Sequence, residues 1–415
     1  MTEYLVLRNA RIDGALRHVH ITDGMITAIE PASDLDDSRD VPASAATLDL
    51  AGRVVRPPFV NAHAHLDKTF WSMPWQPHLP GATIRQCIDR ERSIRAAATE
   101  PQLPRSLALA TRMIEAGVGV IRSHIDVDTL VGLGGVETLV QVREKLAGLV
   151  DLQLVAFPQS GIRADPGVAD LMDEAMRSGV DVVGGLDPHG IDGDVDGHLD
   201  VVFGLAEKYH APIDIHLHDE GPDGLAEIAQ ICERTIVSGM QGNVTISHAY
   251  ALGSATSDAV APVIARLAEA GICIMTDGPV GMTPPVLRLH AAGVPVISGS
   301  DGIRDAWSPY GVPAMAPIAT QLAYQSRMYD DADFELVADI VSIHGSRVVG
   351  VDGHGLEVGC RGDLNVFDAT AVAEIVAESI SPTLVLRGGR VVPPGPSSWP
   401  PLPVTDLAAV GVAPH

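Results

Sequence analysis

The sequence predicts an α/β protein, in which a closed (β/α)8 barrel of the TIM type carries a small β-sandwich domain formed from both chain ends. Three observations favour this fold class. Between Arg53 and about Ser300, eight short β-rich runs alternate with longer helix-like segments, which is the pattern of a (β/α)8 barrel. Many of the helix-like segments end in glycine, which is typical of a helix C-terminus just before a strand. Short alternating apolar runs flank this region on both sides.

The eight predicted barrel strands are short apolar runs rich in β-branched residues. They are Val54–His65, Val118–Ile125, Leu152–Phe157, Val180–Leu186, Pro212–His218, Val244–His248, Ile272–Thr276 and Val294–Ser300. The segments between them place apolar residues at helical spacing, as in Leu103–Ala116, Val168–Ser178 and Ser257–Ala270. An open, doubly wound sheet is the alternative fold, but no G-x-G-x-x-G turn follows the first strand.

Both ends of the chain contain short alternating runs broken by glycine and aspartate. These runs are Tyr4–Leu7, His18–Ile21, Met25–Ile29, Ala46–Leu50, Asp363–Phe367, Thr383–Leu386 and Arg390–Val392. We therefore expect residues 1–55 and 355–394 to form one β-sandwich-like domain and residues 56–354 to form the barrel. Residues 395–415 are expected to form a proline-rich C-terminal tail.

The composition indicates a globular protein that does not bind nucleic acid. The chain has 415 residues, of which 46% are hydrophobic and 20% charged, so a large core can form. Lys and Arg number 28 against 53 Asp and Glu, and the formal charge of −25 repels phosphate backbones and anionic lipids. A neutral or cationic small molecule is compatible with this charge, although the charge does not select one.

Cysteine usage and the N-terminus predict a cytoplasmic location. Cys87, Cys232, Cys273 and Cys360 are scattered without a C-x-x-C pair, which argues against a disulfide framework and fits a reducing compartment. The first residues, Met1–Val6, lack the pattern of a secretory signal. No run of 18 apolar residues is present to span a bilayer, so we expect no membrane partner.

The segment Val60–Lys68 carries two histidines, two residues apart, at the end of an apolar run. Residues i and i+2 of an extended strand project to the same face, so the imidazoles of His63 and His65 can reach one point. Imidazole is a preferred ligand of zinc and iron. The pair alone is weak evidence, because two histidines on one face are more often ordinary strand residues.

Polar side chains recur at the ends of the predicted strands, where the functional residues of a (β/α)8 barrel cluster. They are His63, His65, His124, Asp126, Gln159, Asp187, His189, His216, His218, His248 and Asp301. Seven of the 16 histidines occupy these positions, whereas histidines without a shared role would be scattered through helices and loops. The clustering therefore predicts a metal-dependent active site.

Coordination chemistry suggests the ligands. A catalytic zinc or ferrous ion takes neutral imidazoles and a carboxylate and leaves one position for water. His63, His65, one histidine of the fifth strand and Asp301 supply this set. One divalent ion, Zn²⁺ or alternatively Fe²⁺, would lower the pKa of bound water from about 15.7 to about 7. Asp301 can take the proton of that water, and His248 can orient the nucleophile and polarise the attacked carbon.

These residues resemble the amidohydrolase superfamily, and specifically its cytosine deaminase-like branch, over nearly the whole chain. The matching motifs are Pro57–Asp67, Arg122–Val127, Val155–Ile162, Ile213–His216, Ser247–His248, Ser300–Asp301 and the closing sandwich segment Gly355–Leu364. The resemblance implies a metal-dependent hydrolytic deaminase acting on a non-peptide C–N bond of a small nitrogen heterocycle. The ring would be a pyrimidine such as cytosine, or a triazine, and the product ammonia or an amine.

The resemblance also implies roles for individual residues. It makes His216 the metal ligand from the fifth strand, beside His63, His65 and Asp301. It places Gln159 against the heterocycle in the substrate pocket. Barrels of this branch are often multimeric, so the resemblance also leaves a homo-oligomer open.

The segment after His216 departs from cytosine deaminase, in which a glutamate three residues later serves as the proton shuttle. Here the third residue is Asp219, and the glutamate follows as Glu220. Either the loop shifts Glu220 into place, or His218 carries the proton.

Other positions are more similar to the N-isopropylammelide isopropylaminohydrolases of this branch, which remove an alkylamine from a triazine ring. The similarity includes the segment His216–His218 and Lys68, and Asp187 and Trp307 match positions around the substrate. Gly302 stands where cytosine deaminase has a second aspartate, which weakens cytosine itself as the substrate.

Three of these side chains have chemistry suited to a heterocycle. The Lys68 ammonium can stabilise negative charge on a ring oxygen or help to position a leaving amine, or it can be an exposed loop lysine. The Gln159 amide offers both a donor and an acceptor to a lactam edge. The Trp307 indole can stack on a heteroaromatic ring or pack under its loop.

Two competing functions remain. A cyclic amide or imide hydrolase, similar to dihydroorotase or hydantoinase, commonly holds two metals bridged by a carboxylated lysine on strand 4, and the segment Asp181–His189 has no lysine. A catalytically inactive metal-binding or scaffold barrel would usually lack a ligand, and none is missing.

Overall fold

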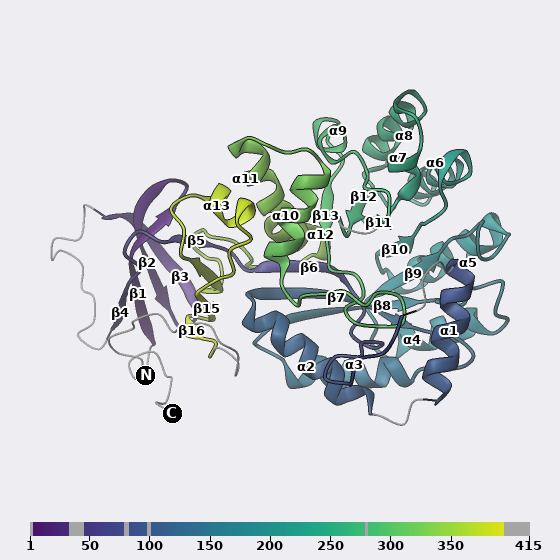
Figure 1. The fold of residues 1–415 in the computed structure, drawn as a ribbon, viewed down its shortest axis with the longest axis horizontal. Coiled ribbons are helices and arrows are strands. Elements are labelled where there is room, and N and C mark those ends of the chain that lie inside the picture. The colour runs from purple at the N-terminus through teal and green to yellow at the C-terminus, as the bar shows by residue number, and fades with distance from the viewer. Residues whose placement is uncertain (1–2, 33–44, 79–82, 98–100, 279–280, 394–415) are drawn as a thin grey trace.

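The structure is a computed structural model that describes residues 3–32, 45–78, 83–97, 101–278 and 281–393. It contains a parallel barrel sheet and a separate mixed sheet built from both ends of the chain (Figure 1). The α/β barrel fold with an added sheet is therefore confirmed. The expected tail at 395–415 lies outside the described residues, and the domain boundaries stay a prediction.

Eight parallel strands form the barrel sheet, each beside the next along the chain. They are β6 (Phe59–Ala64), β7 (Val118–Asp126), β8 (Asp151–Phe157), β9 (Val182–Leu186), β10 (Ile213–His216), β11 (Val244–Ser247), β12 (Cys273–Thr276) and β13 (Val296–Ser298). A parallel bridge between Ala64 and Asp301 brings the two edges together. The barrel is thus nearly closed, and the residues that follow β6 and β13 lie side by side.

Helices between the strands cover the outside of the barrel (Figure 1). Those in the first half are α1 (Ile84–Ala97), α2 (Gln102–Glu115), α3 (Gly134–Lys145), α4 (Val168–Arg177), α5 (Val195–Tyr209) and α6 (Gly221–Val237). Those in the second half are α7 (Tyr250–Ser254), α8 (Ser257–Ala270), α9 (Val286–Ala291), α10 (Met315–Gln325), α11 (Asp331–Asp339), a π-helical turn η2 (Ile340–His344) and α12 (Gly345–Val349). None of the helices in the described part of the chain is long and apolar enough to cross a membrane.

The second sheet combines strands from both chain ends. Its strands are β1 (Tyr4–Ile12), β2 (Ala15–Thr22), β3 (Met25–Pro31), β4 (Ala46–Asp49), β5 (Val54–Arg56), β14 (Leu364–Phe367), β15 (Leu384–Arg387) and β16 (Arg390–Val391). Antiparallel pairing of β5 with β14 joins the N-terminal and C-terminal strands. The helix α13 (Val372–Ala377), which was not predicted, packs Ile375 and Val376 into the main core that the barrel helices share.

The first predicted strand, Val54–His65, is in fact two strands in two different sheets. β5 belongs to the small sheet and β6 to the barrel, and Pro57 and Pro58 lie between them. Proline has no backbone N–H to donate to a sheet, so a strand ends readily at such a pair. The break lets one short segment connect the two parts of the molecule.

The floor of the barrel combines an apolar cluster with a buried ion pair. The apolar part consists of inward-facing residues sealed from below by Val349 of α12: Val60, Ala62, Val120, Cys273, Met275 and Ile297. Across it, the Arg122 guanidinium donates to Asp214 Oδ2 at 2.9 Å and to Gln153 Oε1 at 2.7 Å. Arg122 and Asp214 are 1% and 0% exposed. Each buried charge is therefore compensated by the other, and removal of one would leave the other unpaired in the core.

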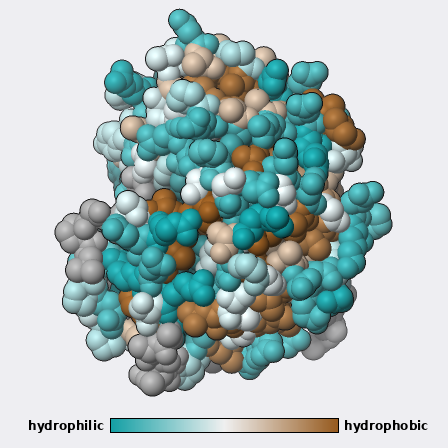
Figure 2. Space-filling view, turned by 90° about the vertical axis from the view of Figure 1, so that its right-hand side faces the viewer, coloured by the Kyte–Doolittle hydropathy of each residue, from teal (hydrophilic) through white to brown (hydrophobic). Residues whose placement is uncertain are grey.

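The carboxyl ends of the barrel strands point away from the small sheet. In Figure 1, β6 runs from the small sheet toward the right-hand side. Figure 2 views that side, where hydrophobic residues show between hydrophilic ones. Functional side chains of (β/α)8 barrels cluster at this end.

Replacing Arg122 should destabilise the fold strongly. Arg122→Leu leaves the Asp214 carboxylate buried without its cation, so we expect the free energy of unfolding to fall by about 3–5 kcal/mol. The matched control is Arg143→Leu, which removes a half-exposed ion pair with Asp181 at 2.9 Å and should cost about 1 kcal/mol or less. Urea denaturation measures both, and equal losses in the two variants would contradict the prediction.

Candidate active site

Four of the predicted site residues bring metal-binding atoms together at the carboxyl end of the barrel. Nε2 of His65 lies 3.2 Å from Asp301 Oδ1 and 3.4 Å from His216 Nε2. Nε2 of His63 lies 3.6 Å from the same Asp301 oxygen. β6 supplies His63, His65 follows it, β10 ends at His216, and Asp301 follows β13. The structure thus gathers all four predicted ligands.

The chemistry of these atoms and the three separations between them are consistent with a metal site. A tetrahedral ion with bonds of about 2.0–2.1 Å needs ligand atoms about 3.3 Å apart. Burial lowers the pKa of His65 to about 4, and burial together with neighbouring histidines holds the pKa of His216 well below its usual value. Both imidazoles are therefore neutral at neutral pH, as metal ligands must be. Nε2 of His63 has no hydrogen-bond partner among the described residues, although it is buried.

A hydrogen-bond chain behind His63 fixes its orientation. The Ser247 hydroxyl donates to Asp214 Oδ1 at 2.6 Å, so its oxygen is left to accept from His63 Nδ1 at 3.2 Å. With the proton on Nδ1, the lone pair of Nε2 points to the metal position. Such outer partners set the tautomer and orientation of metal-bound histidines.

Two of the other groups of possible ligands contain carboxylates that are already paired with arginine. His124 and Asp214 also lie within 4.8 Å of His63, but Asp214 is paired with Arg122 and Ser247. His65 groups with Asp67 and Asp126 in the same way, yet both carboxylates pair with Arg95. The cluster of His63, His65, His216 and Asp301 is therefore the best candidate metal centre in the described part of the chain.

A small, partly open cavity lies beside this cluster. Its walls are His65, Lys68, Phe157, Gln159, Leu186, His216, His218, His248, Asp301, Asp305 and Trp307. A larger hollow between α5 and α6 contains no group of metal-binding residues in the described structure. The cavity at the strand ends is lined by most of the predicted site residues.

Lys68 and Gln159 lie together on one wall of the cavity. The Lys68 ammonium donates to Gln159 Oε1 at 2.6 Å and lies 3.3 Å from Asp126 Oδ1. Lys68 is 6% exposed, so it is not an exposed loop lysine. Because Lys68 occupies the amide oxygen, Gln159 is left with its NH₂ group to donate into the cavity.

Helix α1 covers this wall with buried charges that sequence reasoning missed. Glu91 lies 3.7 Å from the Lys68 ammonium, and Arg95 pairs with Asp126 and Asp67. Burial works to lower the pKa of Lys68, but Asp126 and Glu91 raise it above its usual value. Burial also raises the pKa of Glu91 to about 8 and, together with Asp126, that of Asp67 to about 6. Lys68 is thus a fixed cation at neutral pH.

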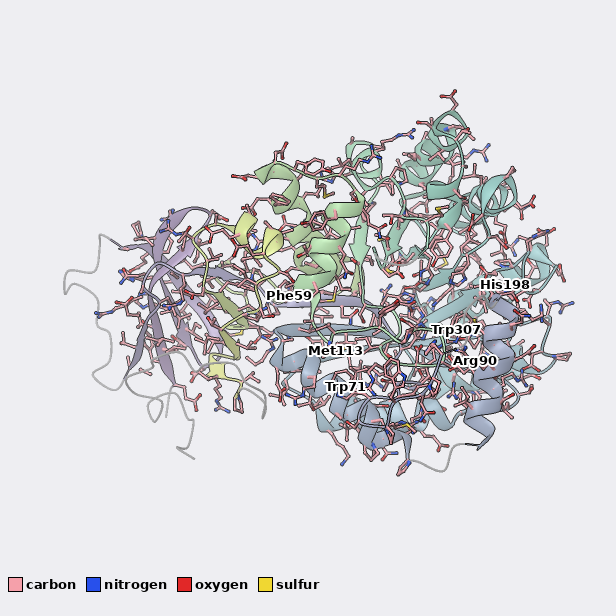
Figure 3. All side chains as sticks on the ribbon, in the orientation of Figure 1. Phe59, Trp71, Arg90, Met113, His198 and Trp307 are labelled. Carbon is pink, nitrogen blue, oxygen red and sulfur yellow. The ribbon has the colours of Figure 1, made fainter. Side chains whose placement is uncertain are left out.

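Trp307 lies between the strand ends and α1 (Figure 3). Its indole N–H donates to Glu91 Oε2 at 2.6 Å, and the Lys68 ammonium lies 5.5 Å from the ring centre. The N–H is therefore unavailable to a ligand, whereas the indole ring forms part of the cavity wall.

His218 and His248 stack on one another in the wall of the cavity. Their ring centres are 4.6 Å apart, and both line the cavity. Asp187 accepts from the backbone N–H of His218 at 2.6 Å and lies 2.9 Å from its Nδ1. Burial works to lower the pKa of His218, but Asp187 raises it above its usual value. Asp187 thus faces His218 and is absent from the cavity wall.

The structure does not bring Glu220 to the cavity. Glu220 is exposed and occupies the position before the first residue of α6, and its side chain caps no backbone N–H there. Asp219 accepts from the backbone N–H of Gly190 at 2.8 Å instead of facing the cluster. Of the three residues considered for the proton shuttle, His218 lines the cavity.

Sequence reasoning assigned no role to four further polar residues at the site. Glu91 lies on α1, Ser247 ends β11, Asp277 follows β12, and Asp305 lies in the loop after β13. Asp277 groups with His248 and Asp301 within 4.8 Å, and its Oδ2 has no hydrogen-bond partner in the described structure. Only Ser247 and Asp277 had a sequence signal, namely their place at a strand end.

Comparison with known proteins identifies the family. A model of the amidohydrolase family matches residues 46–393. The N-isopropylammelide isopropyl amidohydrolase of Pseudomonas sp. (strain ADP) is 32% identical over 358 residues, which cover 83% of this chain and 87% of that protein.

Two crystal structures share the fold over nearly the full length of both chains. N-isopropylammelide isopropylaminohydrolase from Burkholderia multivorans is 38% identical with a TM-score of 0.88, and the match covers 94% of this chain and 98% of that one. The 5-methylcytosine deaminase from Klebsiella pneumoniae, liganded with phosphonocytosine, is 27% identical with a TM-score of 0.83, also covering 94% and 98%. The chain therefore belongs to the amidohydrolase family.

Proposed function

We propose that this protein is a metal-dependent hydrolase that releases ammonia or an alkylamine from a ring carbon of a small nitrogen heterocycle. The single observation that carries the proposal is the cluster of His63, His65, His216 and Asp301 beside a cavity that Lys68, Gln159 and Trp307 also line. The names of the relatives, which refer to an alkylaminotriazine and to a methylated cytosine, support the same class of substrate.

One divalent ion, Zn²⁺ or alternatively Fe²⁺, would be held by His63, His65, His216 and Asp301. When bound, it supplies a Lewis acid that lowers the pKa of water to about 7 and so provides a nucleophile at neutral pH. The donor set does not select between the two metals, because nitrogen and oxygen ligands suit both.

The residues of the chain hold the ring and move protons. Lys68 and the NH₂ group of Gln159 are placed to bind a ring carbonyl oxygen, and the cation stabilises negative charge that develops on it. The Trp307 ring forms a wall against which a planar heterocycle can stack. His248 orients the attacking water and polarises the attacked carbon.

His218 is the proposed proton carrier to the leaving amine. It lines the cavity, and Asp187 holds its ring in one orientation through Nδ1. Nε2 is then the nitrogen that can exchange a proton with the ring or the amine. Asp301, on the other side, is the proposed acceptor of the proton from the attacking water.

Metal binding should depend on the hydroxyl behind His63. We expect about one zinc ion per chain. We also expect Ser247→Ala to weaken zinc affinity about 10- to 100-fold, because His63 loses the partner of its Nδ1. Elemental analysis and competition with a chromophoric chelator measure both quantities.

The control is Ser298→Ala, which removes a buried hydroxyl that donates to the backbone oxygen of Thr276 at 2.6 Å. This variant should bind zinc like the natural protein. Equal zinc affinities for Ser247→Ala and the natural protein would show that the hydrogen bond between His63 Nδ1 and Ser247 does not support zinc binding.

Amine release tests the proposed function directly. The metal-loaded protein should release ammonia or an alkylamine from at least one of cytosine, isocytosine, ammelide, N-isopropylammelide and creatinine-like rings. Asp301→Asn, which loses a metal ligand and the proton acceptor, should abolish the reaction. An enzyme-coupled assay for ammonia and chromatography for alkylamines measure the products, and silence on every ring with metal bound would overturn the substrate class.

The two candidates for the proton shuttle can be separated by matched variants. His218→Gln should lower kcat about 100- to 10,000-fold, because the leaving amine loses its proton donor. Glu220→Gln should leave kcat essentially unchanged, because Glu220 is exposed and away from the cavity. Steady-state kinetics on the ring with the fastest turnover gives both values, and the reverse pattern would assign the shuttle to Glu220.

A further inference from the structure

Asp305 is a buried carboxylate on the cavity wall whose two oxygens differ. It lies four residues after Asp301 and is 1% exposed. Its Oδ1 accepts from the backbone N–H groups of Trp307 and Ser308, each at 2.8 Å. These two hydrogen bonds close a turn and fix the orientation of the carboxylate.

The second oxygen, Oδ2, is buried and has no hydrogen-bond partner in the described structure. The Lys68 ammonium donates to Gln159 and Asp126, and in the described structure it makes no hydrogen bond to this oxygen. An unpaired buried carboxylate oxygen is costly, so such an atom in a native site calls for a partner that is not part of the protein.

The neighbouring glycine leaves room for this oxygen. A Cβ at Gly302 would lie 1.9 Å from Asp305 Oδ2, so an ordinary side chain at 302 would displace the carboxylate. The oxygen therefore fills the space beside the backbone that directly follows Asp301. Asp305 lines the same cavity as Asp301.

The polar groups of Lys68, Gln159 and Trp307, which line the same cavity, are donors or are already hydrogen-bonded. Lys68 and the NH₂ group of Gln159 donate, and the Trp307 N–H is bound to Glu91. A ring carbonyl satisfies the donors, but it cannot satisfy Asp305. The cavity therefore offers two complementary contacts, one for an acceptor and one for a donor on the ligand.

We propose that Asp305 Oδ2 accepts a hydrogen bond from an N–H group of the heterocycle, which makes Asp305 a residue that determines substrate specificity. The selected rings carry a lactam N–H or an amino N–H in addition to the carbonyl oxygen that Lys68 and Gln159 bind. This inference rests on the proposed function, from which it takes the class of ring. Burial raises the pKa of Asp305 to about 6, while Lys68 opposes the rise, so the carboxylate is mostly ionised at neutral pH.

The variant Asp305→Asn tests the inference with little change in shape. Its amide oxygen can still accept from the N–H groups of Trp307 and Ser308, so the NH₂ group takes the place of Oδ2. The turn is preserved, and the contact with the ligand changes from acceptor to donor. The matched control is Glu227→Gln, a buried carboxyl that does not line the cavity, whose Oε1 accepts from the backbone N–H of His189 at 2.8 Å and whose Oε2 has no hydrogen-bond partner in the described structure.

Calorimetry on the zinc-loaded proteins uses uracil and cyanuric acid, which carry lactam N–H groups, and their fully N-methylated counterparts, which do not. We expect Asp305→Asn to weaken binding of the two N–H rings about 10- to 100-fold and to change binding of the methylated rings little. Glu227→Gln should bind all four rings like the natural protein. Zinc content and melting temperature are measured alongside.

Equal losses for both kinds of ring, or no loss for Asp305→Asn, would show that Asp305 only supports the turn and would overturn the inference. Failure of the natural protein to bind any N–H ring would overturn it as well. A different result would contradict the proposed function, namely no release of ammonia or amine from any ring. The binding measurement would still test the role of Asp305 in that case.

Discussion

The candidate metal centre depends on the seam at which the last barrel strand meets the first. The backbone N–H of Asp301 donates to the carbonyl oxygen of His63 at 2.9 Å. A Cβ at Gly299 would lie 2.4 Å from both the backbone nitrogen and oxygen of His63, so only glycine permits this approach. His63 and His65 come from one side of the seam and Asp301 from the other. The contact that closes the barrel is thus also the one that sets three of the four proposed ligands within reach of one ion.

The barrel and its cluster of histidines could be predicted because both follow from short-range rules. Apolar runs with a regular spacing identify the strands, and their carboxyl ends must meet at one end of a barrel. The separation of His63 and His65 by one residue places both on one face. The same rules could not locate the break at Pro57 and Pro58, because an apolar run continues on both sides of it.

The remaining site residues depend on contacts between segments that are distant in the chain. Glu91 reaches Lys68 and Trp307 only because α1, which sits in the loop after β6, folds over the cavity. Asp187 lies at a strand end, as predicted, but its backbone has a φ of 34° and its carboxylate turns toward His218. Position along a strand indicates that a side chain is near the site. It does not indicate whether that side chain faces the ligand or holds a neighbour.

The buried pair of Arg122 and Asp214 connects the stability of the barrel to its chemistry. Apolar residues of similar size often stabilise a protein core as well as a buried ion pair does, so stability alone does not explain why two charges stand in the barrel floor. Asp214 has a second task, since its other oxygen accepts from Ser247, which in turn orients His63. Arg122 keeps Asp214 in place, because it donates to the oxygen that Ser247 does not use. The ion pair is therefore best explained by its role in orienting the imidazole of His63 through Ser247.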